Sequence, residues 1–184
     1  MDTQWERYEV FEKERSDQPH RNAGSVHAPD AEMALENARD VFVRRPNCLS
    51  LWVVPERAVF AKTAQELEEG WDWTESPQNA QTEPYLVFQK QGQTAREVYV
   101  VHVGQVIAAS PQHAMRLAIE TFPHKEVFVW WVVPERVVIR SEASDAPSMF
   151  EPAHTKRYRN HLAYPVEPIM RQLKSAAELL ESDE

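Results

Sequence analysis

The sequence is poor in the residues from which many active sites are built. Its 184 residues include one cysteine and four glycines. Cys48 cannot form an internal disulfide or a cysteine metal site, and this favours a reducing compartment. The glycines are isolated from one another, so a glycine-rich loop that holds phosphate is excluded. Cys48 is followed by Leu49, and we interpret it as a small buried residue, not a nucleophile.

Basic residues and long apolar runs are also scarce. The chain has 20 Lys and Arg against 29 Asp and Glu, which gives a formal net charge of −9. This balance argues against nucleic acid and against an anionic membrane surface as partners. No apolar run approaches the roughly 18 residues that cross a bilayer, and the N-terminus has no apolar signal region. We therefore expect a soluble, unexported, cytoplasmic protein.

No metal site can be recognised from residue spacing. The seven histidines are scattered, and no pair has the spacing of two ligands on one helix. A single Glu-x-x-His occurs at Glu151 and His154, the spacing used by di-iron proteins. Those sites need the motif on two helices, and here it contains Pro152, so we interpret it as a coincidence. We expect no metal, flavin, nucleotide or other cofactor.

The most informative feature is an internal duplication. The hexapeptide Trp-Val-Val-Pro-Glu-Arg occurs at 52–57 and again at 131–136, a separation of 131 − 52 = 79 residues. An apolar-periodic stretch precedes each copy, at 34–42 and at 114–122, offset by 80. Other matching segments upstream have offsets of 77 to 80. Insertions therefore fall between structural elements and not within them.

The first repeat predicts two strands, a helix and a third strand. We expect the strands at 8–12, 22–27 and 49–54, with a fourth short strand over 58–61 left open after the proline. Asp30 is the predicted N-cap of the helix. The apolar face of this helix consists of Ala31, Ala34, Leu35, Ala38, Val41 and Phe42.

The second repeat follows the same order. Its early strand material is predicted at 97–103 and 106–109, and its last strand at 127–133. Ser110 and Pro111 occupy the N-cap and the first helical position. The helix has an apolar face formed by Ala114, Leu117, Ala118 and Phe122.

These patterns predict an α+β fold made of two strand-strand-helix-strand units. Each repeat has fewer than about 60 residues, for which burial is marginal, so we expect the units to share a core or pack face to face. We expect helices packed on antiparallel sheet, pseudo-twofold symmetry and a C-terminal tail helix. The predicted boundaries are 1–63 for unit one, 64–84 for a linker, 85–142 for unit two and 143–184 for the tail. Trp71 and Trp73 predict a linker docked on the body.

Two sets of charged residues are candidates for partner binding. Glu56 and Arg57, with Glu135 and Arg136, either present charge to a partner at equivalent edges or only solvate a turn; both readings stay open. A second set, found only in unit one, flanks the second strand: His20, Arg21 and His27.

The tail carries a third candidate surface. The stretch 149–168 is predicted to be irregular and combines aromatic with basic residues, among them Tyr158 and Arg159. Aromatic and arginine side chains dominate interface energetics, so we select these two as partner-binding residues. A helix is predicted from Pro168, with one apolar face. The alternative, that the tail only covers its own sheets, is equally open.

Two segments resemble a known family. The runs 20–28, 31–40 and 51–54 resemble the B subunit of the phenylacetate-degradation monooxygenase, a multicomponent ring-1,2-phenylacetyl-CoA epoxidase, and 150–165 resembles the tail of that family. Members of the family carry one unit followed by the tail, whereas here a second unit precedes the tail. The fused chain either replaces two copies of a single-unit protein or serves a different oxygenase.

The resemblance implies a non-catalytic accessory subunit without a cofactor. Its partners would be a di-iron catalytic subunit, the structural partner of that subunit, and an iron-sulfur flavoprotein reductase. The rival hypothesis is a small cofactor-independent enzyme of the dimeric α+β barrel type, in which a lone His or Arg acts on an aromatic substrate. A sealed interface between the units favours the first, and a cleft of hundreds of cubic ångströms with an inward His or Arg favours the second.

Overall fold

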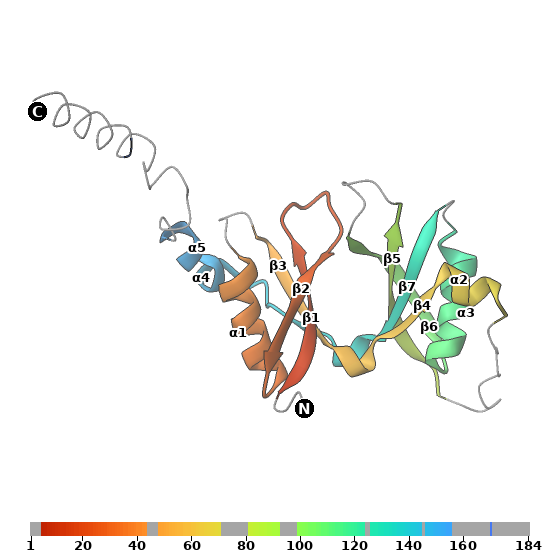
Figure 1. Ribbon diagram of the computed structural model, residues 1–184. Helices are drawn as coiled ribbons and strands as arrows, with labels where there is room; N and C mark the ends of the chain where they lie inside the picture. The colour runs from red at the N-terminus through yellow and green to blue at the C-terminus, as the bar shows by residue number, and fades with distance from the viewer. Residues whose placement is uncertain are drawn as a thin grey trace, which may run out of the picture.

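The protein is an α+β fold in which one antiparallel sheet carries helices on its outer faces (Figure 1). The computed structural model describes residues 5–43, 48–70, 81–92, 99–123, 126–144, 146–155 and 170. Its eight strands lie in the order β4-β7-β5-β6-β2-β1-β3-β8. We refer to β2-β1-β3-β8 with helix α1 as the first half, and to β6-β5-β7-β4 with helix α3 as the second half.

The strands and helices follow the repeat. The first copy and its connection contain β1 (Glu6–Lys13), β2 (Arg21–Ala28), α1 (Ala31–Phe42), β3 (Ser50–Pro55), η1 (Glu56–Ala58), β4 (Phe60–Thr63) and α2 (Ala64–Glu68). The second contains β5 (Glu83–Gln91), β6 (Val100–Ala108), α3 (Pro111–Thr121), β7 (Val127–Pro134), η2 (Glu135–Val137) and β8 (Ile139–Arg140). Two short helices follow, α4 (Ala146–Phe150) and α5 (Pro152–Thr155).

Two predictions about individual elements were wrong. The segments 97–103 and 106–109, predicted as the early strand material of the second copy, contribute residues 100–108 to one strand, β6, that continues through Gly104. The first strand of the second copy is β5, which lies before them in the chain. In the tail, 149–155 is not irregular, because α4 and α5 are helical. Apart from Met170, the helix predicted from Pro168 lies outside the described residues, as do the linker residues Trp71 and Trp73.

The fourth strand of each half comes from the other copy. β4 follows the first copy in sequence but pairs with β7, where Phe60 is opposite Val132. β8 follows the second copy but pairs with β3, where Trp52 is opposite Arg140. Each half of the sheet is therefore completed by a strand that the other copy supplies.

The helices are fixed by caps and by small residues. The side chain of Asp30 accepts a hydrogen bond from the Met33 amide, and Ser110 accepts one from the amide of His113, as the predicted N-caps require. Ala34 and Ala38 of α1 are fully buried against the first half. α3 packs in the same way on the second half through Ala114, Met115 and Ala118.

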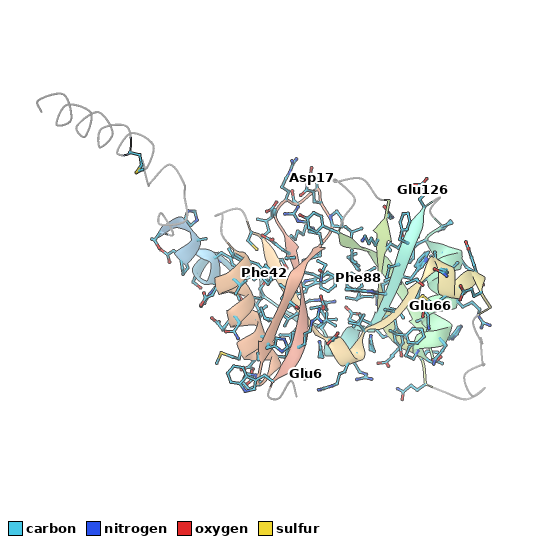
Figure 2. All side chains as sticks on the ribbon, viewed as in Figure 1. Glu6, Asp17, Phe42, Glu66, Phe88 and Glu126 are labelled. Atoms are coloured by element: carbon cyan, nitrogen blue, oxygen red, sulfur yellow. The ribbon has the colours of Figure 1, made fainter. Side chains whose placement is uncertain are left out.

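A third apolar cluster lies between the two halves. Phe11 and Phe88 are fully buried there, and their ring centroids are 4.3 Å apart. Figure 2 shows side chains filling the space between the two facing halves of the sheet, with Phe88 among them. The other buried members are Val54, Leu86, Val100, Val133 and Val138. The two copies thus share a core, as their small size required.

One glycine in each copy admits a phenylalanine from its helix. Gly24 has φ +138° and Gly104 has φ +159°. A Cβ on Gly24 would lie 2.9 Å from the ring of Phe42, and a Cβ on Gly104 would overlap the ring of Phe122. Contacts this short force the ring or the strand to move.

Among the described residues, no helix is long and apolar enough to cross a membrane.

We predict that Gly104→Ala lowers the free energy of unfolding by about 2 kcal/mol, because the added methyl overlaps the Phe122 ring. In a Phe122→Ala background the same change should cost about 1 kcal/mol less, since the overlapping ring is gone. Urea unfolding of the four proteins measures this coupling. Equal costs in both backgrounds would contradict the contact.

The strand exchange predicts that neither copy folds alone. A cut within 71–80 places β4 and its partner β7 on different fragments. It separates β8 from its partner β3 in the same way. We expect each fragment to be unfolded by near-ultraviolet circular dichroism, and an equimolar mixture to recover the spectrum of the intact chain. Cooperative thermal unfolding of the N-terminal fragment alone would show that the exchange is not required.

Candidate functional site: surfaces between the two halves

The arginine of each hexapeptide ties its turn to the first strand of the same copy. Arg57 forms an ion pair with Glu6, and the Tyr8 hydroxyl donates to Glu6 at 3.1 Å. The second copy repeats this group with Arg136, Glu83 and Tyr85, where Arg136 Nε lies 2.7 Å from Glu83 Oε2. Both arginine side chains remain exposed, by 76% and 67%. Each arginine therefore connects its turn to the first strand of its copy while its outer side remains open to solvent.

The glutamates of the two hexapeptides have different partners. Glu56 Oε1 lies 3.4 Å from Arg7 Nη1. Glu135 Oε1 lies 2.7 Å from Arg140 Nη2, and its other oxygen accepts a hydrogen bond from Gln105 at 3.0 Å. Identical sequence motifs thus have different surroundings in the two copies.

His20, a candidate for partner binding in the sequence, lies inside the protein. It is 7% exposed, its ring stacks on Trp52 with centroids 3.6 Å apart, and its Nε2 lies 3.0 Å from Ser50 Oγ. His102 meets the same indole edge-on at 5.2 Å, and the Arg140 guanidinium lies 4.9 Å above the indole. We call these residues the Trp52 cluster.

Burial keeps the histidines of the Trp52 cluster neutral. Desolvation lowers the pKa of His20 to about 3, and coulombic interactions with His102, Lys13 and Arg140 contribute to the same shift. Desolvation also lowers the pKa of His102. Neutral, packed imidazoles of this kind serve as core residues and are not available as surface contacts.

The remaining residues of the predicted edge are separated along β2. Arg21 lies at the junction of the halves, where it pairs with Glu14 at 3.0 Å and its guanidinium lies 5.2 Å from the Tyr99 ring. His27 is exposed at the other end of the strand, roughly 20 Å away at the usual rise of a strand. It lies in a shallow hollow with Trp5. Arg21 and His27 therefore lie in different surroundings near opposite ends of β2.

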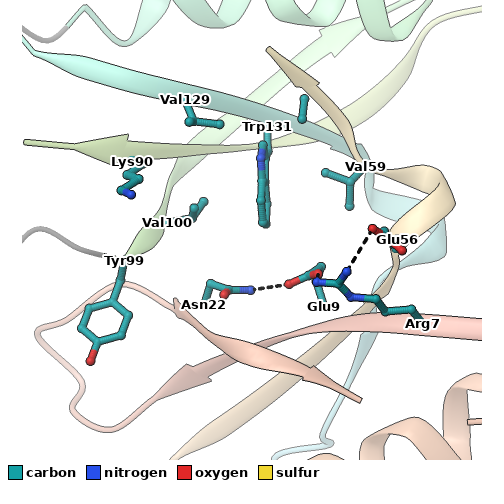
Figure 3. Close-up of a pocket in the computed structure, with 11 residues that line it drawn as sticks. Arg7, Glu9, Asn22, Glu56, Val59, Lys90, Tyr99, Val100, Val129 and Trp131 are labelled. Atoms are coloured by element: carbon teal, nitrogen blue, oxygen red, sulfur yellow. Dashed lines mark hydrogen bonds and ion pairs between the residues drawn. The ribbon is translucent and has the colours of Figure 1, made fainter. Parts of the chain in front are cut away.

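A groove that the sequence did not predict opens beside Trp131. It has a volume of about 590 Å³ and lies between the halves (Figure 3). Lys90 and Tyr99 stand at one end, Arg7 and Glu56 at the other, and the indole of Trp131 stands between the two ends. The signal in the sequence was indirect: at the offset of 80, the second copy has Val100 where the first copy has His20.

Both features that were to discriminate the two functions are present. The centre of the interface is sealed by Phe11 and Phe88. The groove at its side contains an arginine, Arg7, whose guanidinium is held by Glu9 at 2.8 Å and faces Glu56 at 3.4 Å. Neither His20 nor His102 lines this groove.

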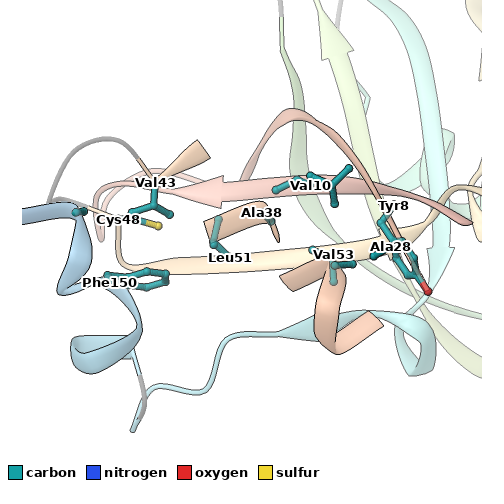
Figure 4. Packing of buried hydrophobic residues seen from close by; sticks show 12 residues of the cluster. Tyr8, Val10, Ala28, Ala38, Val43, Cys48, Leu51, Val53 and Phe150 are labelled. Carbon is teal, nitrogen blue, oxygen red and sulfur yellow. The ribbon is translucent and has the colours of Figure 1, made fainter. Parts of the chain in front are cut away.

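The remaining candidates for chemistry are inert or isolated. Cys48 is 5% exposed, and desolvation raises its pKa to about 12, so the thiol stays protonated. Figure 4 shows it in the core beside Val43 and Leu51. Within the described ranges, no three His, Cys, Asp or Glu side chains form a group that could hold a metal ion. Tyr158 and Arg159 lie outside these ranges.

The neutral His20 predicts a pH dependence of stability. In the unfolded chain His20 binds a proton near pH 6.5, whereas in the folded protein it does so only near pH 3, so stability is lost as pH falls between these values. Between about pH 7 and about pH 5 the wild type should lose roughly 2 kcal/mol more than His20→Gln. Urea unfolding at the two pH values measures the difference. Equal losses would show that folding does not lower the pKa of His20.

Comparison with known proteins identifies the duplicated unit. The family described as phenylacetic acid degradation B matches the chain twice, over residues 4–92 and 81–169. The B subunit of 1,2-phenylacetyl-CoA epoxidase from Escherichia coli (strain K12) is 44% identical over 72 residues, which are 39% of this chain and 76% of that protein. No solved structure matches. Because the two family matches together span most of the chain, it belongs to the phenylacetic acid degradation B family, as a tandem duplication of the family's domain.

Proposed function

We propose that the chain is a non-catalytic accessory subunit of a multicomponent oxygenase in phenylacetate degradation. The double match to the phenylacetic acid degradation B family carries this proposal, with the relative named as a subunit of 1,2-phenylacetyl-CoA epoxidase in support. Its partners would be the di-iron catalytic subunit and the structural partner of that subunit, with the reductase as a further contact. In this role the chain acts through protein contacts.

The tandem arrangement suggests how the chain fits such a complex. We propose that the units 1–63 and 85–142 are related by an approximate twofold axis, so that one chain offers two versions of one surface. The shared Arg-Glu-Tyr group and the paired glycine-phenylalanine contacts support this relation. A fused chain then takes the place of two single-unit subunits.

The start of the tail supports a role for the residues that follow. Phe150 and Ala153 of α4 and α5 are 6% and 7% exposed in the core of the first half (Figure 4). The chain is therefore anchored beside α1 three residues before Lys156. We propose that Tyr158 and Arg159, which follow this anchor in the sequence, contact the oxygenase. The exposed sides of Arg57 and Arg136 are secondary candidates.

We predict that Tyr158→Ala with Arg159→Ala weakens association with the oxygenase subunits by about 2 kcal/mol, or roughly thirtyfold in Kd. The thermal midpoint should change little, because the buried anchor at Phe150 is intact. Co-expression with the oxygenase subunits, size-exclusion chromatography and a titration of the purified components measure both effects.

Two variants control this experiment. Arg15→Ala removes a surface arginine, 64% exposed, from the β1–β2 turn, and should bind normally. Phe150→Ala should lower the thermal midpoint because it empties a core position. Normal binding by the double variant would move the interface elsewhere, and failure of the wild type to co-elute would refute the accessory role.

The groove beside Trp131 favours a second candidate function, the small cofactor-independent enzyme. Its volume is in the range of substrate sites. Arg7 supplies a cation, but Glu9 and Glu56 neutralise it. An enzyme would need a group that gives or takes a proton in the groove, and Glu9 is the most enclosed candidate, with a side chain 8% exposed. Turnover of an aromatic substrate by the isolated chain, abolished in Glu9→Gln, would favour this alternative.

A further inference from the structure

The groove and the Trp52 cluster occupy equivalent positions in the two copies. Trp52 is opposite Arg140 in the β3–β8 pair, and Trp131 is opposite Ala61 in the β7–β4 pair. The same correspondence holds on the neighbouring strands, where Phe11 is opposite Asn22 and Phe88 is opposite His102. The strand pairing therefore agrees with the sequence offset on which residues of the two sites correspond to one another.

The two sites differ in the residues that cover the indole. His20 stacks on Trp52 at 3.6 Å, and Arg140 lies 4.9 Å from the same ring. At the offset of 80, Val100 takes the place of His20, and the register places Ala61 where Arg140 stands. Both replacements are smaller. The 590 Å³ groove therefore lies where the first copy holds a planar ring against its tryptophan.

The charges of the groove favour an anionic ligand. Arg7 is paired with Glu9 and lies near Glu56, so this end carries no uncompensated cation. The Asn22 amide donates to Glu9 at 2.9 Å and is also committed. Lys90 is partly buried at the other end, and no ion pair joins its ammonium to the residues that the structure describes. Lys90 is thus the charge that a ligand would complement.

We propose that the groove beside Trp131 binds a small, planar, apolar molecule that bears an anionic group. The ring lies against the indole of Trp131 as the His20 ring lies against Trp52, and the anion pairs with Lys90. Val59, Val100 and Val129 supply the apolar wall. Charged side chains stand at both ends of the groove, and its volume is that of a small-molecule site. This inference goes beyond the accessory role and does not depend on it.

The probes are phenylacetate, its neutral analogue 2-phenylacetamide, and cyclohexylacetate, which keeps the charge but lacks a planar ring. Calorimetric titration of the purified chain should give saturable, one-to-one binding of phenylacetate. Each analogue should bind about tenfold more weakly, because one loses the charge-assisted contact and the other the stacking. No saturation by phenylacetate at about 10 mM would overturn the proposal, as would equal binding of the three probes.

Transplanting the histidine of the first copy tests the location. Val100→His places on β6 the ring that fills the equivalent site, and it should weaken phenylacetate binding at least tenfold. Ile107→His adds the same side chain to the same strand at an exposed position, and should bind like the wild type. Unchanged binding by Val100→His with an unchanged thermal midpoint would place the ligand elsewhere and overturn the proposal.

A second variant is independent of how well Val100→His folds. Lys90→Gln should reduce phenylacetate affinity to that of the amide while leaving the amide affinity unchanged. An equal loss for both probes, or no loss for either, would contradict the assignment of the anion to Lys90. Because all titrations use the isolated chain, they fail or succeed separately from co-elution with oxygenase subunits.

Discussion

The contact between Phe11 and Phe88 is the interaction on which the rest of the structure depends. Both rings are fully buried, with centroids 4.3 Å apart, and they join the inner faces of the two half sheets. Burying one such side chain is worth about 1.5–3 kcal/mol, and a separated half would expose its ring to water. The exchange of β4 and β8 adds a second constraint, because each half of the sheet is completed only by a strand from the other copy. The two copies are therefore one folding unit despite their separate sequences.

Local patterns in the sequence were sufficient for most of the fold. The helix spacing, the caps at Asp30 and Ser110 and the alanine stripe all follow from contacts within a few residues, and the repeat placed them twice. The partners of β4 and β8 could not be predicted in this way. A strand as short as Ile139–Arg140 has no pattern that selects its neighbour, and both partners lie far away in sequence. The extent of β6 was also missed, because the strand continues through Gly104, where the absence of a side chain makes room for Phe122.

The candidate site was less predictable, because its properties depend on which strands become neighbours. The hexapeptide arginines were predicted to lie in exposed turns, but the sequence did not identify Glu6 and Glu83 as their partners. His20 was a candidate for partner binding, yet it is buried because the opposing copy closes over the end of β2. There the His20 carbonyl accepts a hydrogen bond from the His102 amide at 2.9 Å. A position-by-position comparison of the copies does hold one signal of the groove: His20 of the first copy is replaced by the smaller Val100 in the second.

Fusion of the two copies removes a restriction that a symmetric dimer imposes. In a twofold dimer of identical subunits, a residue on one side of the interface recurs on the other, so a filled site on one side requires a filled site on both. In this chain Trp52 is covered by a histidine and an arginine, whereas Trp131 borders an open groove. The glutamates of the hexapeptides have diverged in the same way, since Glu56 faces Arg7 and Glu135 binds Arg140 and Gln105. The side chains beside the shared core differ between the two copies, which allows one side of the interface to stabilise the fold while the other side binds a ligand.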